Sequence, residues 1–101
     1  MPALSIISWR DIPAQVVVRR GRETAKVQLS ARFQEAVDRA AMRAGKGASD
    51  AYLADWKRSE PRPCSDDIQA EAAAEAARLE ALFSDERLEQ LIRAKGLATG
   101  P

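Results

Sequence analysis

A cluster of basic residues is the part of this chain that could most readily do chemistry. Arg19, Arg20 and Arg22 surround Gly21, and Lys26 follows them closely. Arginine keeps its charge in proteins, so this corner must face water, an anion or an acidic partner. The residues leave three interpretations open: a solvated basic surface, a contact for an acidic protein, or a site for a phosphorylated small molecule or nucleic acid.

The residue types that most catalytic sites need are missing from the sequence. It has no histidine, one cysteine and neither the GxGxxG nor the GxxxxGK[ST] phosphate-binding motif. Without histidine, the commonest general base and metal ligand is lost. Asp66 and Asp67 are adjacent and would point apart on a helix, so they serve better as caps than as metal ligands. Cys64 has no neighbouring base to activate it. We therefore expect a non-catalytic protein without cofactor or metal.

Length and charge restrict the function further. The chain has 101 residues and a formal net charge of +1, which fits one domain and argues against a dedicated nucleic-acid binder. The charge is uneven, because residues 1–63 hold 12 basic against 7 acidic residues and residues 64–101 hold 4 against 8. No segment approaches a membrane span or a signal peptide, and Cys64 is alone, so we expect a cytoplasmic protein. A homo-oligomer remains possible.

The first part of the chain predicts strands and then a helix. Leu4 to Trp9 and Gln15 to Arg20 are rich in β-branched residues and are expected to be strands. A helical stripe then runs from Ala25 to Ala44 and ends at Gly45. Thr24 and Ser30 are both possible N-caps, and the stripe favours Thr24. Gly21 would then be a strand-to-helix turn, and the free N–H groups of the helix would face the basic residues.

The second part predicts one ambiguous segment and a long helix. Ser49 to Arg58 fits either a strand or a helical turn, and we favour a strand. Ser65 is expected to cap a helix with an apolar stripe from Ile68 to Phe83, and Ser84-Asp85 to cap a further segment that ends at Gly96. The predicted fold is α+β, in the order β-β-α-β-α, with a small, mostly antiparallel sheet and two helices packed on one face. Residues 1–98 would form one domain and residues 99–101 a frayed tail.

Three segments resemble a known family: WRDIPAQVVV at residues 9–18, RETAKVQLSARFQEAVDRAAMRAG at 22–45 and DAYLADWKR at 50–58. Together they resemble the bacterial proteins of about 100 residues labelled "virulence factor", which are common in alphaproteobacteria. Genes of this family tend to lie near methylenetetrahydrofolate reductase and corrinoid methyl-transfer proteins. The resemblance therefore implies an accessory protein of folate- or cobalamin-dependent one-carbon metabolism, with such a reductase as a possible partner.

The candidate binding surface combines the family motif with the basic corner. It would contact an acidic protein or, alternatively, bind a folate or nucleotide anion. Trp9 and Trp56 could be interface anchors, although a chain with five aromatic residues needs them equally in its core. The candidate residues are Trp9, Arg10, Asp11, Arg19, Arg20, Arg22 and Lys26.

Overall fold

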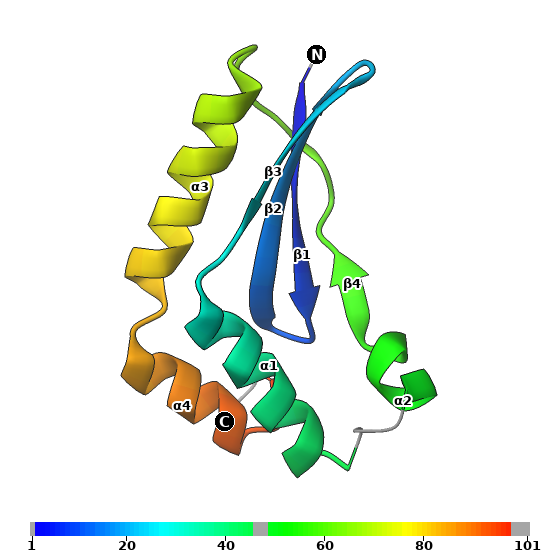
Figure 1. Cartoon of the computed structure of the whole chain (residues 1–101), viewed down its shortest axis with the longest axis vertical. Coiled ribbons are helices and arrows are strands. Elements are labelled where there is room, and N and C mark those ends of the chain that lie inside the picture. Colours follow the sequence, from blue (N-terminus) through cyan, green and yellow to red (C-terminus); the bar gives the residue numbers. More distant parts are fainter. Residues whose placement is uncertain (1, 46–48, 98–101) are drawn as a thin grey trace.

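The computed structural model describes residues 2–45 and 49–97, which form an antiparallel sheet and four helices (Figure 1). The sheet has the order β3-β2-β1-β4, and β5 pairs with the same edge of β1 as β4 does. The strands are β1 (Ala3–Trp9), β2 (Ile12–Arg20), β3 (Glu23–Gln28), β4 (Trp56–Arg58) and β5 (Arg62–Pro63). The helices are α1 (Ala31–Arg43), α2 (Ser49–Ala54), α3 (Ile68–Leu82) and α4 (Asp85–Arg93). The α+β class is thus confirmed, and the element order is richer than predicted. The predicted tail at residues 99–101 lies outside the described residues.

The prediction of a helix that begins at Thr24 was wrong. Residues Glu23–Gln28 form β3, an antiparallel partner of β2, and α1 begins at Ala31 with Ser30 as its N-cap. Gly21 has a φ of 57°, which suits a tight turn from β2 into β3 rather than a turn into a helix. Ala25 lies in the core and Val27 packs against it, so this segment alternates between two faces as a strand does.

The segment from Ser49 to Arg58 combines the two predicted structures. It begins as the helix α2 and continues, after one residue, as the strand β4, which pairs Trp56 with Trp9 of β1. The strand that we favoured is therefore correct for the last three residues only. Four described helices, rather than two, result from this short helix and from the break between α3 and α4.

The caps of the C-terminal helices differ in part from the prediction. The N-cap of α3 is Asp67, whose carboxylate accepts a hydrogen bond from the N–H of Ala70 at 3.1 Å, so Ser65 is not the cap. The cap of α4 is Ser84, as expected, and its hydroxyl accepts from the N–H of Arg87 at 3.1 Å. These caps place a sharp corner at Phe83 between the two helices (Figure 1).

A single hydrophobic cluster joins one face of the sheet to the helices. Because side chains alternate along a strand, the cluster receives alternate residues from the central part of β1, β2 and β3, and a register shift between Ile7 and Ser8 brings Trp9 to the same side. These strand residues include Leu4, Val16, Val18 and Ala25, and the helices add Phe33, Val37, Ala72, Leu79 and Leu91 among others. The residues at the alternate positions, such as Val17, are outside this cluster.

A buried carboxylate fastens α3 to the edge of the sheet. Glu75 of α3 is only 5% exposed, and its Oε1 accepts hydrogen bonds from Arg78 of the same helix and from Arg62 of β5, both at 3.0 Å. The hydrogen bond from Arg78 lowers the pKa of Glu75, burial opposes this change, and the charge of Arg62 adds to the lowering. The pair of arginines thus keeps this carboxylate ionised and holds β5 against the helix.

Glu75→Gln should therefore lower the free energy of unfolding by about 1–3 kcal/mol at neutral pH. Because the pKa of Glu75 is lower in the folded than in the unfolded chain, its stabilisation is present above the unfolded pKa and is lost as the pH falls. Urea denaturation at a series of pH values should show the gap between wild type and variant closing below about pH 4. As control, Glu89→Gln removes an exposed carboxylate that pairs with Arg39 and Arg93, and should change stability by less than about 0.5 kcal/mol. A gap that persists at low pH would contradict this account.

Candidate functional site

The structure divides the candidate residues between the two ends of β2 (Figure 1). Trp9, Arg10 and Asp11 form the turn from β1 into β2, which we call the WRD turn. The others lie at or near the turn from β2 into β3, which we call the basic hairpin: Arg19, Arg20, Arg22 and Lys26. The nine residues of β2 separate the two turns by roughly 26 Å, at about 3.3 Å per residue. One compact surface that contains all seven residues is thus excluded by the strand between them.

Trp9 of the WRD turn is part of the core. Its side chain is fully buried, its ring stacks on Tyr52 of α2 with centroids 6.1 Å apart, and its indole N–H donates to the carbonyl of Tyr52 at 2.9 Å. Trp56 is half-buried and also packs against the core. An interface anchor must offer its ring to the partner, so Trp9 cannot serve as one in this conformation.

Arg10 connects the WRD turn to two segments that are distant in sequence. Its backbone has a φ of 51°, and its N–H donates to the carbonyl of Asp55 at 3.0 Å. The guanidinium lies over the Trp9 ring, 5.0 Å from the centroid, and bonds the Asp55 carboxylate at 3.3 Å and the carbonyl of Lys95 at 2.8 Å. Each of these contacts uses the side chain for internal structure, which leaves little of it for a partner.

Asp11 completes the same junction. Its N–H donates to the carbonyl of Gly96 at 2.8 Å, and its carboxylate receives Lys57 of β4 at 3.3 Å. Gly96 itself lies against the Trp9 ring, because a Cβ atom at this position would be 2.8 Å from Cζ3. The WRD turn therefore joins α2, β4 and the end of α4, and the family-like motif has a structural explanation.

The basic hairpin has a different character, because most of its cations form no ion pair with the residues that the structure describes. Arg20 is the exception: it bonds the Glu23 carboxylate at 2.6 Å and the carbonyl of Asp66 at 2.8 Å. Arg19, Arg22 and Lys26 are exposed, and no carboxylate among the described residues forms an ion pair with them. The helix N-terminus that was predicted beside these residues is absent, since the chain continues here as β3.

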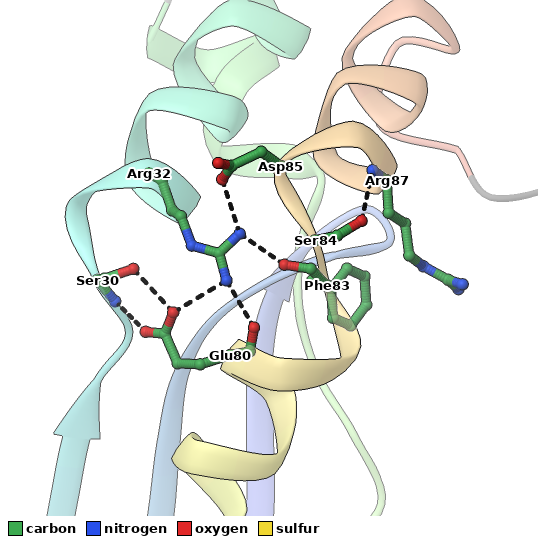
Figure 2. A network of polar contacts seen from close by, with 7 residues as sticks. All are labelled: Ser30, Arg32, Glu80, Phe83, Ser84, Asp85 and Arg87. Carbon is green, nitrogen blue, oxygen red and sulfur yellow. Dashed lines mark hydrogen bonds and ion pairs between the residues drawn. The ribbon is translucent and has the colours of Figure 1, made fainter.

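A polar network that the sequence did not predict joins the helices (Figure 2). Glu80 of α3 accepts hydrogen bonds from the N–H and the hydroxyl of Ser30, at 2.7 and 2.9 Å, and so caps the start of α1. In return, Arg32 of α1 donates to the carbonyls of Glu80 and Phe83, each at 2.6 Å, and so caps the end of α3. It also bonds the Asp85 carboxylate at 3.1 Å. The two helix ends thus satisfy each other's free backbone groups.

This network is structural rather than reactive. Partial burial raises the pKa of Glu80, but the hydrogen bonds from Ser30 and Arg32 outweigh it, so the pKa is lowered overall. An ionised carboxylate with bound donors is a poor general base. In the sequence only the capping candidates Ser30 and Ser84-Asp85 pointed to this site, and their links to each other were not predictable because Ser30 and Glu80 are 50 residues apart.

The described residues offer no further chemical centre. They contain no group of three or more histidine, cysteine, aspartate or glutamate side chains that could hold a metal ion. Burial and the charge of Glu71 raise the pKa of the Cys64 thiol, which favours the unreactive thiol over the thiolate. The basic hairpin is therefore the candidate site that remains, and its cations are suited to an anionic partner.

The close packing of Gly96 against Trp9 gives a test of the WRD turn. Gly96→Ala places a Cβ atom against the buried ring, whereas Gly45→Ala at a similar φ of 72° meets open space. Both substitutions carry the cost of a left-handed alanine, about 1–2 kcal/mol. We expect Gly96→Ala to lower the free energy of unfolding by about 1–3 kcal/mol more than Gly45→Ala, in thermal or urea denaturation. Equal losses would show that Trp9 is free to move.

The network of Figure 2 can be tested by exchanging arginine for lysine. Arg32→Lys keeps the charge but loses the planar fork that reaches two carbonyls and two carboxylates, so the free energy of unfolding should fall by about 1–2 kcal/mol. Arg39→Lys on the same helix disturbs only an exposed pair with Glu89 and should cost less than about 0.5 kcal/mol. Urea denaturation measures both, and an equal effect would remove the special role of Arg32.

None of the helices that the structure describes combines the length and the apolar character needed to cross a membrane. In a comparison with known protein families, the family model described as "Virulence factor" matches residues 7–92. No curated protein and no solved structure matches the chain. The matched range includes both the WRD turn and the basic hairpin. Because the match covers most of its length, this chain belongs to the virulence factor family.

Proposed function

We propose that this protein is a non-catalytic binding subunit that attaches to an acidic partner protein through the basic hairpin. The observation that carries this proposal is the contrast between its cations. Eight basic residues form ion pairs with carboxylates of the described chain: Arg10, Arg20, Arg32, Arg39, Lys57, Arg62, Arg78 and Arg93. Arg19, Arg22 and Lys26 form none with the described residues, as is also true of Arg43, Arg58, Arg87 and Lys95, but only the first three share one hairpin.

An acidic protein fits this hairpin better than a small anion does. A tight anion site needs converging donors, such as the free N–H groups of a helix start. At the basic hairpin the backbone forms the β2–β3 ladder, and Gly21 and Arg22 are turn residues. Separate cations on an exposed strand and turn suit a broad acidic surface, which they would steer and orient. The anion-binding alternative therefore has weaker support.

The family resemblance supplies a first partner to test. It implies an enzyme of folate- or cobalamin-dependent one-carbon metabolism, such as methylenetetrahydrofolate reductase. In this role the protein would contribute binding surface and no reacting group.

Co-purification tests this function directly. The full-length chain, carrying an affinity tag, is co-expressed with the methylenetetrahydrofolate reductase of the same genome, and the eluted reductase is quantified. We expect it to co-elute with the wild type, and Arg19→Glu with Lys26→Glu to reduce its recovery roughly tenfold or more, since close charge pairs contribute strongly to such contacts. Arg43→Glu with Lys95→Glu is the matched control, because both residues are exposed and lie outside the hairpin. No recovery with the wild type would reject this partner, and thermal shifts with folate polyglutamate would instead support the anion-binding alternative.

A further inference from the structure

The face of the sheet that points away from the core carries exposed cations around a centre that is largely buried. By the register, Ser5 lies beside Val17, which lies beside Lys26, while Ile7 lies beside Arg58 of β4. Arg19 follows two residues after Val17 on the same face. We call these six residues the outer face. Ser5, Ile7 and Val17 do not belong to the hydrophobic cluster that the helices share with the opposite side of these strands.

The charge on the outer face has one sign. Arg19, Lys26 and Arg58 are exposed, and none of them forms an ion pair with a described carboxylate. The five strands contain a single acidic residue, Glu23, and it pairs with Arg20, whose side chain points to the α3 side. The next acidic residue in the chain after Arg58 is Glu60, which is exposed and lies in the connection from β4 to β5, outside the strands. The face is therefore cationic at both edges, at Lys26 of β3 and Arg58 of β4.

The centre of the outer face is apolar. Val17 is only 3% exposed although it lies outside the core, which fits long neighbouring side chains that lie across it. Lys26, its cross-strand neighbour, has an aliphatic stem suited to this. Ile7 is half-buried, and it is a diagonal neighbour of Val17 because it pairs with Gln15. A partner that supplied apolar side chains could replace these stems and free the charged groups for ion pairs.

We propose that the outer face binds an acidic amphipathic helix of another protein. This inference rests on the proposed function, because it names the surface and the kind of partner that such a binding subunit would use. Three strand spacings separate β3 from β4, about 14 Å at roughly 4.8 Å each, and a helix with its side chains is about 10–12 Å wide. One helix thus fits between Lys26 and Arg58, with its apolar stripe on Ile7 and Val17 and its carboxylates at the two edges.

Two other occupants fit this face less well. A second copy of the chain would bring two sets of Arg19, Lys26 and Arg58 together without a carboxylate between them. Single-stranded nucleic acid is bound on sheets by stacking on exposed aromatic rings. The five aromatic residues of this chain are all in the core or packed against it: Trp9, Phe33, Tyr52, Trp56 and Phe83.

The test uses NMR titration of the ¹⁵N-labelled full-length chain with three probes. The first is a peptide of about five helical turns in which glutamates flank a leucine stripe. The second has the same composition with the stripe scrambled, and the third is oligodeoxythymidine. We expect the first peptide to shift the amides of Ile7, Val17, Arg19 and Lys26, and to bind roughly tenfold more tightly than the scrambled peptide, because only the stripe can cover the apolar centre.

Variants of the chain assign the contact. Lys26→Glu with Arg58→Glu should weaken the first peptide roughly tenfold or more, while Arg43→Glu with Lys95→Glu should leave its affinity unchanged. Far-UV circular dichroism and thermal denaturation confirm that each variant is folded. The proposal is overturned by shifts confined to the helices, by equal binding of the scrambled peptide, by tighter binding of the oligonucleotide, or by no binding.

The two proposals fail in different ways. If the reductase co-purifies with the wild type and with Arg58→Glu alike, and the peptide does not bind, the outer face is the wrong surface and the binding function stands. If the striped peptide binds the outer face but the reductase is not recovered, the surface stands and the proposed partner is wrong.

Discussion

The need of buried polar groups for hydrogen-bond partners organises one end of this protein around the WRD turn. Burying Trp9 takes its indole N–H and the backbone of the turn out of water, and unpaired groups there would cost several kcal/mol in total. Their partners are carbonyls of Tyr52, Asp55 and Gly96. The position of α2, the start of β4 and the end of α4 all follow from these bonds. The arginine and glutamate contacts of Figure 2 apply the same rule to the helix ends.

Local patterns predicted the elements that are periodic over many residues and missed those set by distant contacts. The valines of β2 and the stripe of α3 are strong signals, and both elements are present. The β3 segment failed because Ala25 and Leu29 fit a helical stripe as well as a strand. Only the pairing of this segment with β2 across the Gly21 turn shows that it follows the two-residue period of a strand and not the 3.6-residue period of a helix. In the same way, the short β4 depends on its pairing with β1, which no local pattern indicates.

The candidate site was predictable in composition and not in arrangement. The sequence indicated a basic corner at Arg19 to Lys26, and the structure keeps these cations exposed, apart from the paired Arg20. The sequence could not indicate that the Arg10 side chain bonds Asp55 and Lys95, because these partners lie 45 and 85 residues away. Nor could it place Arg58 on the same face as Lys26, since that depends on the register of three strand pairs. A cation such as Arg10 that bonds distant residues stabilises the fold, whereas an exposed cation without such bonds can contact a partner.

The bond from Arg10 to Lys95 has a consequence for how the chain reaches its native state. These residues are 85 positions apart, so the first turn of the sheet is completed only after the chain has been synthesised as far as Lys95. Until then Trp9 lacks part of its cover, and the nascent β1–β2 hairpin exposes an aromatic ring. Such long-range closure slows folding and leaves an aggregation-prone intermediate. Truncation before Lys95 would therefore act on a turn 85 residues earlier in the sequence, by leaving the first hairpin without this partner.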